Sequence, residues 1–236
     1  MIRVTENLTA VRRQLESAAE SASRQPETVT LVAVSKRHPA SAIAAAASAG
    51  QVHFGENYVS EGVAKIRELG RSGFVWHYIG AIQSNKTRDI AAHFDWVHTI
   101  DRLKIAARLS AQRPADQAPL NVCIQVNIDN EPQKAGVSLE AIGPLAGEID
   151  ALPHLRLRGL MCLPAAHADT ARTRTAFARM REAMITIQHD FSSVDTLSMG
   201  MSGDMDLAIR EGSTMIRVGT AIFGPRDSVE PGGGVP

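Results

Sequence analysis

The sequence lacks an excess of either charge. Its 236 residues hold 25 Lys and Arg against 25 Asp and Glu, so the formal net charge at pH 7 is zero. No block of basic residues occurs, basic and aromatic residues do not interleave, and aromatic residues make up only 4% of the chain. We therefore expect no nucleic-acid partner, because binding to a phosphate backbone needs clustered positive charge.

Cysteines and long apolar runs are also scarce. The two cysteines, Cys123 and Cys162, lie in strand-like apolar runs without metal-ligand spacing, so we expect buried free thiols in a reducing, cytoplasmic setting. The first 23 residues carry charges throughout, so no signal peptide is expected. No apolar run approaches the ~18–20 residues of a membrane-spanning helix, so no membrane association is expected.

Several motifs that would indicate other functions are missing. No group of His, Cys, Asp and Glu has the spacing of a metal site. The chain has neither a Gly-x-Ser-x-Gly nucleophile turn nor a Walker-type phosphate loop. No interdomain linker is visible, so we expect one domain over residues 1–226. Residues 227–236 are rich in Gly and Pro and are expected to form a flexible C-terminal tail.

Short apolar strands alternate with helical segments along the chain. Residues 2–24 carry apolar side chains at spacings of three and four, which predicts an amphipathic N-terminal helix. Strands are predicted at 29–35, 52–54, 75–79, 96–99, 121–127, 155–160, 195–198 and 215–218. Further helices are predicted at 39–49, 56–69, 84–92, 101–112, 138–150, 168–189 and 203–211.

This alternation predicts an α/β protein, a single (β/α)₈ barrel of TIM type with an extra N-terminal helix. Most of the strands are apolar and β-branched, as in a parallel sheet that is covered on both faces. Eight successive β/α units close a barrel without a break in strand order. An open doubly wound sheet is the alternative, but no Gly-x-Gly-x-x-Gly follows the first predicted strand.

A lysine directly follows the first predicted strand. The apolar segment LVAVS at 31–35 runs into Lys36, and functional residues of barrels lie at the C-terminal ends of the strands. A desolvated lysine amine there loses its proton and attacks an aldehyde to form an imine. The alternative interpretation is a solvated surface lysine.

Small polar residues follow the last two predicted strands. Ser202 and Gly203 come after the seventh strand, and Gly219 and Thr220 come after the eighth. Barrels frequently bind phosphate with these two loops, through hydroxyls and backbone N–H groups. In the alternative interpretation, Ser202 caps the following helix and the other residues form ordinary turns.

Three further polar residues lie in or beside apolar strands. Arg217 is either a fixed cation that faces a heteroaromatic nitrogen or the partner of a core carboxylate, because a buried arginine needs a partner. Asn57 either orients a ligand or caps the helix that follows. His77 is expected to be a core histidine bonded to the backbone, with an acid/base role as the alternative.

Seven segments of the sequence resemble the pyridoxal 5′-phosphate (PLP) homeostasis protein family. The two most specific are LSMGMSGDMDLAI at 197–209 and GSTMIRVGTAIFG at 212–224. The others are LVAVSK at 31–36, FGENYV at 54–59, WHYIGAIQSNK at 76–86, a VN…E…KxG pattern within 126–136 and RGLM at 158–161. The resemblance implies a barrel similar to the N-terminal domain of alanine racemase, with PLP as its cofactor.

The resemblance also implies a role for each candidate residue. Lys36 would form the Schiff base with PLP, Arg217 would face the pyridine nitrogen and disfavour its protonation, and Asn57 would lie near the cofactor. The phosphate would be held by Ser202, Gly219 and Thr220.

The function implied by the resemblance is storage, buffering or delivery of PLP rather than catalysis. Alanine racemase-like enzymes use a tyrosine from a second domain of the partner subunit, and we expect that domain to be absent here because the sequence ends soon after Gly224. Apo PLP-dependent enzymes are the expected partners, and a monomer is expected. Two alternatives stay open: a low-activity racemase-like PLP enzyme, and a phosphate-binding barrel isomerase without PLP.

Overall fold

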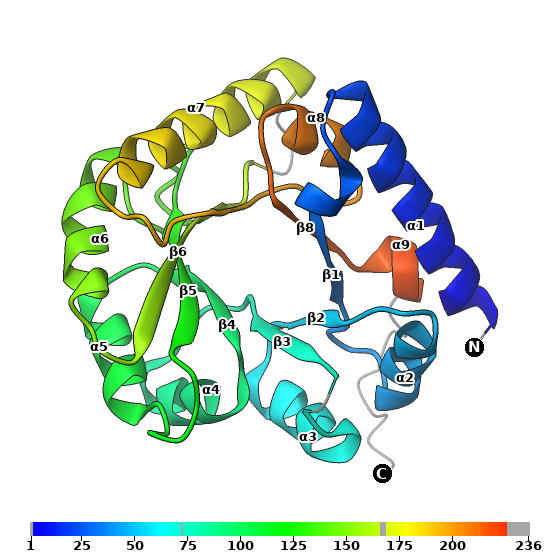
Figure 1. The fold of residues 1–236 in the computed structure, drawn as a ribbon, viewed down its shortest axis with the longest axis horizontal. Helices are drawn as coiled ribbons and strands as arrows, with labels where there is room; N and C mark the ends of the chain where they lie inside the picture. Colours follow the sequence, from blue (N-terminus) through cyan, green and yellow to red (C-terminus); the bar gives the residue numbers. More distant parts are fainter. Residues whose placement is uncertain (1, 72, 166–168, 226–236) are drawn as a thin grey trace, which may run out of the picture.

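The strands of the protein close into one parallel barrel. The computed structural model describes residues 2–71, 73–165 and 169–225. Its strands pair in chain order, and the last strand pairs with the first, as the view down the barrel in Figure 1 shows. They are β1 Thr30–Val34, β2 His53–Glu56, β3 Val75–Tyr78, β4 Trp96–Ile100, β5 Leu120–Val126, β6 Leu155–Cys162, β7 Thr196–Ser198 and β8 Met215–Val218. The predicted (β/α)₈ barrel is confirmed.

Helices surround this barrel on its outside (Figure 1). The α-helices are α1 Ile2–Ser21, α2 Ala40–Ser48, α3 Val59–Leu69, α4 Thr87–His93, α5 Leu103–Gln112, α6 Ile142–Asp150, α7 Thr170–Gln188, α8 Met205–Arg210 and α9 Thr220–Phe223. Short 3₁₀ helices lie at η1 Pro26–Thr28, η2 Ser84–Lys86 and η3 Leu139–Ala141. Among the residues described, no helix is both long and apolar enough to cross a bilayer. The predicted tail at 227–236 lies outside the described residues.

The extra N-terminal helix lies over the seam where β8 meets β1. Helix α1 packs against α2, α8 and α9, and its side chains Leu8, Val11 and Leu15 are buried there. The Asn7 amide nitrogen donates to the carbonyl of Ile222 in α9 over 3.0 Å. Helix α1 therefore supports the short helix that follows the last strand.

The junction after the second strand was predicted wrongly. The sequence pattern predicts a strand at 52–54 and a helix from 56, whereas β2 continues to Glu56 and α3 begins at Val59. Glu56 pairs in register with Tyr78 of β3, and its side chain is fully buried. A carboxylate is rarely fully buried, and this one has a buried cationic partner, Lys65, on α3 outside the barrel.

Other boundaries differ by a few residues. Helix α1 ends at Ser21 rather than 24, β6 continues to Cys162 rather than 160, and α8 begins at Met205 rather than 203. The short helix α9 was not predicted at all. Helix ends fray and short helices carry little periodic signal, so sequence patterns place them poorly.

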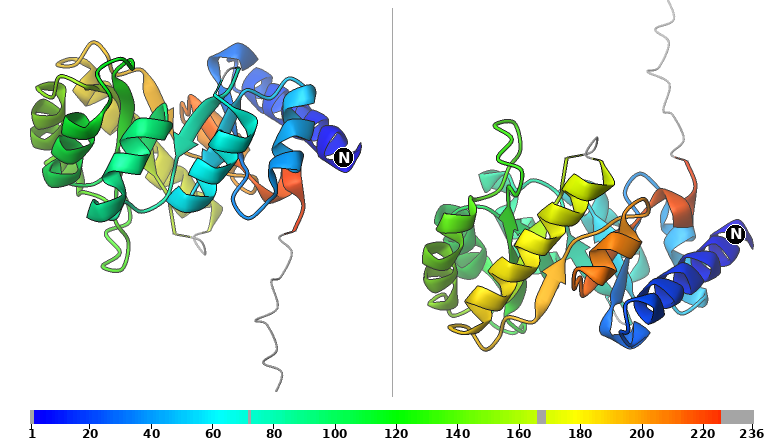
Figure 2. Two further views of the ribbon diagram at one scale, coloured as in Figure 1. Left: turned by 90° about the horizontal axis from the view of Figure 1, so that it is seen from below. Right: turned by 90° about the horizontal axis from the view of Figure 1, so that it is seen from above.

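The inside of the barrel carries several polar side chains among its apolar ones. Ser198, His77 and His98 are fully buried, and Arg217 is only 4% exposed. In the side views of Figure 2, the long loop after β5 and helix α9 project from the same end of the barrel. This is the C-terminal end of the strands, where barrels place their functional residues.

Candidate functional site

A cavity of about 200 Å³ at the C-terminal end of the barrel brings most of the predicted residues together. Its wall combines residues that follow β1, β2, β7 and β8 with apolar residues between them. The predicted residues in this wall are Lys36, Asn57, Ser202, Arg217, Gly219 and Thr220. Gly203 is next to Ser202 in the chain but is not part of the wall.

Lys36 lies in the turn between β1 and α2. Its side chain is half-buried at the cavity, so the alternative of a fully solvated surface lysine does not hold. The next residue, Arg37, has a positive φ of 63°. The Arg37 backbone N–H donates to Glu61 Oε1 over 2.5 Å, which anchors this turn to α3.

A buried ionic cluster supports the same turn from behind. The Lys65 amine of α3 donates to the Ser35 carbonyl over 2.8 Å and to Glu56 Oε1 and Glu61 Oε1 over 2.7 Å each. The Ser35 hydroxyl also donates to Glu56 Oε1, over 2.6 Å. Burial raises the pKa of Glu56, and the nearby Lys65 opposes that shift. The Lys65 amine already binds three oxygens, so it is not available as a nucleophile.

This cluster was not predicted from the sequence. Glu61 and Lys65 are four residues apart on one helix, which was the available signal. Nothing in the sequence indicated that this pair would lie over the end of β1.

Asn57 enters the wall from the end of β2. It lies one residue before Tyr58, the N-cap position of α3, so the helix-cap interpretation of Asn57 is excluded. Its side-chain Oδ1 is buried and has no hydrogen-bond partner among the residues described. A Cβ atom on Gly80 would lie only 2.0 Å from the Asn57 carbonyl oxygen, so the chain needs glycine there. Asn57 therefore offers a ligand an acceptor in a fixed place.

Arg217 reaches the cavity from inside β8. Its Nη1 donates to the Ser198 hydroxyl over 2.6 Å and its Nη2 to the Cys162 carbonyl over 3.0 Å. None of the ion pairs among the described residues includes Arg217, so the alternative of a core carboxylate partner does not hold. A guanidinium has five N–H donors, so this cation keeps donors for a ligand in the cavity.

The loops after β7 and β8 contribute the exposed, polar part of the wall. The N-cap position of α8 is Asp204, two residues beyond Ser202, so Ser202 does not cap that helix. Within the described parts of the chain, the hydroxyls of Ser202 and Thr220 have no protein partner. A Cβ atom on Gly219 would lie 3.2 Å from the Val34 carbonyl oxygen, so a side chain there would crowd the wall. These loops can hold an oxyanion.

His77 differs from the prediction in its partners. It is a core histidine, fully buried, but it contacts the rings of His53 and His98 at 2.9 Å each rather than the backbone. The prediction of a backbone partner is therefore wrong. Sequence spacing could not reveal the contact, because the three histidines come from three different strands. Within the described residues, no group of three His, Cys, Asp or Glu could hold a metal ion.

Comparison with known proteins shows the family. The family model of the alanine racemase N-terminal domain matches residues 7–227. The pyridoxal phosphate homeostasis protein of Escherichia coli K12 is 53% identical over 227 residues, which are 95% of this chain and 97% of the relative. The chain belongs to the pyridoxal phosphate homeostasis protein family. The resemblance seen in the motifs is thereby confirmed.

Solved structures agree with this family. PipY of Synechococcus elongatus PCC7942, determined with PLP bound, is 38% identical with a TM-score of 0.81, covering 94% of this chain and 100% of PipY. An alanine racemase of Corynebacterium glutamicum is 18% identical with a TM-score of 0.66. The match covers 94% of this chain but only 62% of the racemase. At this identity it shows a shared barrel fold alone.

Proposed function

We propose that the protein binds PLP in the cavity as a Schiff base on Lys36 and acts in PLP homeostasis by storing, buffering and delivering the cofactor. The observation that carries this proposal is the meeting of Lys36, Arg217 and the Ser202 and Thr220 hydroxyls in one cavity. The names of the family members and the PLP bound to PipY support it.

The residues of the cavity fit the chemical groups of PLP. The aldehyde needs an amine, which Lys36 supplies, and the phosphate needs donors, which Ser202, Thr220 and the loops around Gly203 and Gly219 supply. Asn57 Oδ1 is a buried acceptor without a protein partner, which suits a hydroxyl of a ligand. Bound PLP supplies an aldehyde that condenses with an amine and releases water.

Arg217 would make bound PLP a weaker electron sink, a feature that active alanine racemase-like enzymes share, so carriage is inferred from the lack of a paired acid and base. A permanent cation beside the pyridine nitrogen disfavours protonation of the ring, because like charges repel. An unprotonated ring withdraws electrons weakly. Among the described residues of the cavity wall, only Lys36 and Arg217 have ionisable side chains, so none of the others described there can move a proton. The curated relatives are named as homeostasis proteins, which agrees with this view.

The wider setting follows from the same proposal. We propose that residues 1–226 form one functional domain that works as a monomer, which light scattering can test. Cys123 and Cys162 are buried free thiols, a state that a reducing cytosol maintains. Apo PLP-dependent enzymes are the proposed recipients.

Trapping with borohydride tests the site. Reduction of the PLP-loaded protein should fix PLP on Lys36, as peptide mass spectrometry will show. Lys36→Ala should lose both the imine absorbance and the trapped cofactor. The control variants Lys86→Ala and Lys134→Ala should keep the imine absorbance and the trapped cofactor. A label on Lys86 or Lys134 would show that Lys36 is not the site.

Pyridoxal, which lacks the phosphate, tests the role of the two loops. Charge-assisted hydrogen bonds contribute roughly 1.5–3 kcal/mol each, so pyridoxal should bind at least tenfold more weakly than PLP. Ser202→Ala should weaken the binding of PLP more than that of pyridoxal, and so reduce the difference in affinity between the two ligands. Equal affinity for the two ligands would remove the phosphate site from the proposal.

A further inference from the structure

A continuous chain of hydrogen bonds crosses the inside of the barrel. Arg217 Nη1 lies 2.6 Å from Ser198 Oγ, which lies 2.9 Å from His98 Nδ1. His98 Nε2 lies 2.9 Å from His77 Nδ1, and His77 Nε2 lies 2.9 Å from His53 Nδ1. We call Ser198, His98, His77 and His53 the histidine chain.

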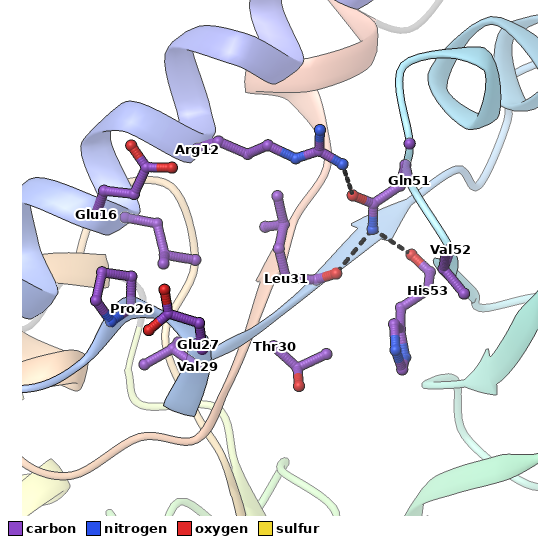
Figure 3. Close-up of a pocket in the computed structure, with 12 residues that line it drawn as sticks. Arg12, Glu16, Pro26, Glu27, Val29, Thr30, Leu31, Gln51, Val52 and His53 are labelled. Atoms are coloured by element: carbon purple, nitrogen blue, oxygen red, sulfur yellow. Dashed lines mark hydrogen bonds between the residues drawn. The ribbon is translucent and has the colours of Figure 1, made fainter.

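The histidine chain joins the two ends of the barrel. Its first three members are fully buried on β7, β4 and β3, whereas His53 is partly exposed at the first residue of β2. His53 lines a second cavity of about 490 Å³, together with Arg12 and Gln51 (Figure 3). This cavity lies at the N-terminal end of the strands, opposite the proposed PLP cavity.

Arg217 sets the direction of every bond in the chain. A guanidinium can only donate, so Ser198 Oγ accepts from it. Among the described residues, the only other partner of this hydroxyl is His98 Nδ1, so the hydroxyl hydrogen must go there. His98 then carries its proton on Nε2 and donates to His77, and His77 in turn donates through its own Nε2 to His53.

The surroundings of His53, His77 and His98 favour the neutral form of each imidazole ring. Burial lowers the pKa of His77, and it lowers the pKa of His98 to about 3, with Arg217 adding to the shift. Burial also lowers the pKa of His53, while Asp95 opposes that shift. A neutral imidazole has one donor and one acceptor, which is what each position in the chain requires.

We propose that the histidine chain positions Arg217 and couples the PLP cavity to the opposite end of the barrel through His53. The proposal rests on the proposed function, since PLP is the ligand that Arg217 would meet. His98 and His77 act here as positioning residues, because neither is part of the cavity wall.

The coupling follows from the acceptor on His53. Protonation of His53 at Nδ1 removes the acceptor that His77 needs. Either the bond between the two rings breaks, or the chain reverses and the buried Ser198 hydroxyl loses its acceptor. Each outcome removes one hydrogen bond from the chain that supports Ser198 and Arg217, so protonation of His53 and a fully bonded chain behind Arg217 oppose each other. Because linkage is reciprocal, PLP binding should lower the pKa of His53, and protonation of His53 should weaken PLP binding.

Other charged groups surround His53, so its contribution to the pH dependence is measured as the difference between the native protein and a variant that does not titrate at this position. The groups that face it from the neighbouring elements and share its cavity or its field are Arg12, Glu16, Glu27, His77 and Asp95. His53→Gln is the matched variant, because an amide can donate or accept in the same place without titrating.

The first experiment needs no ligand. Long-range ¹H–¹⁵N spectra of the histidine side chains report which ring nitrogen carries the proton. We expect the Nε2–H form at His53, His77 and His98 in the native protein. The Nδ1–H form at His77 or His98 would overturn the proposed direction of the chain, whatever the protein binds.

The second experiment measures the coupling. On saturation with PLP, the pKa of His53 should fall, and a fall of about 0.5 units corresponds to a roughly threefold change in PLP affinity. Below that pKa, native protein should lose PLP affinity more steeply than His53→Gln, since imine formation at Lys36 contributes equally to both. Identical pH profiles would overturn the coupling. Failure of both proteins to bind PLP at any pH would instead overturn the proposed function, and the coupling with it.

Discussion

Gly80 controls the position of Asn57 in the wall of the cavity. A Cβ atom at residue 80 would lie 2.0 Å from the Asn57 carbonyl oxygen, and both groups belong to the backbone, so neither can rotate away. Gly80→Ala should lower stability by about 1–3 kcal/mol, as overpacking does, and should weaken PLP binding. Chemical denaturation and titration with PLP measure the two effects.

The control for this change is Gly147→Ala, on the exposed face of α6, where a new Cβ meets no atom within 4 Å among the described residues. Alanine in a helix interior should stabilise by about 0.5–1 kcal/mol relative to glycine. If Gly80→Ala kept native stability and PLP affinity, the close approach at Asn57 would not matter.

Glu56 should make stability depend on pH. Burial raises its pKa above the ordinary value of 4.5, so the folded protein holds this proton at pH values where the unfolded chain has released it. The free energy of unfolding should therefore fall as the pH rises from about 4.5 through the raised pKa. Glu56→Gln removes this titration, so relative to the variant the native protein should lose stability with rising pH across that window.

Urea denaturation of the two proteins at several pH values from 4.5 upward tests this slope. Glu68→Gln makes the same change at an exposed position of α3 and serves as the control. A constant difference between native protein and Glu56→Gln across the window would show that Lys65 fully offsets the burial of the carboxylate.

The site residues at the ends of strands could be predicted from the sequence. The residues that are brought together only by long-range packing could not. Lys36, Ser202 and Arg217 could be placed because a barrel collects the C-terminal ends of its strands at one face. The contact between His98 and Ser198 joins residues 100 positions apart across the barrel. No local pattern encodes such a contact, because it depends on which way each strand turns its side chains inside the closed barrel.

At the scale of elements, the regular repeats were predictable and the irregular pieces were not. Most of the strands are short apolar, β-branched runs, and each long helix carries several turns of apolar pattern, which is enough to predict the type of element. Helix α9 spans only Thr220–Phe223, and β2 ends in a buried carboxylate, so both depart from those patterns. The proposed PLP cavity lies between these irregular pieces.

Helix α1 is expected to stabilise the elements that follow β7 and β8. Leu8 of α1 is fully buried, and this helix packs on α8 and α9. Leu8→Ala should reduce the free energy of unfolding by about 2–5 kcal/mol through lost burial and a new cavity. Denaturant unfolding followed by circular dichroism measures the loss.

The neighbouring residue offers a matched control. Thr9 is exposed on the same helix, and its hydroxyl donates only to the Thr5 carbonyl one turn earlier. Thr9→Ala should change stability by no more than about 0.5 kcal/mol. Equal effects of the two changes would mean that α1 contributes little to the packing of the barrel.

At the scale of the whole molecule, both tyrosines of the sequence lie outside the wall of the proposed site, in a neighbouring pocket. The Tyr58 hydroxyl accepts from Arg37, and this residue is 46% exposed. The Tyr78 hydroxyl donates to the Ala81 carbonyl over 2.9 Å, and burial raises the pKa of Tyr78 to about 12. Neither residue is part of the wall of the Lys36 cavity, so neither is placed as a base there.

This arrangement predicts a carrier without appreciable racemase activity. A racemase needs one group on each face of the α-carbon, and general acid/base groups typically supply about 10²–10⁴-fold each. Among the described residues of the cavity wall, only Lys36 is suited to move a proton, because Arg217 keeps its charge. The PLP-loaded protein should therefore leave L-alanine unchanged at concentrations where a true racemase equilibrates it, while transferring PLP to an apo PLP-dependent enzyme and restoring that enzyme's activity. Robust racemisation that disappears in Lys36→Ala would establish an enzyme in place of a carrier.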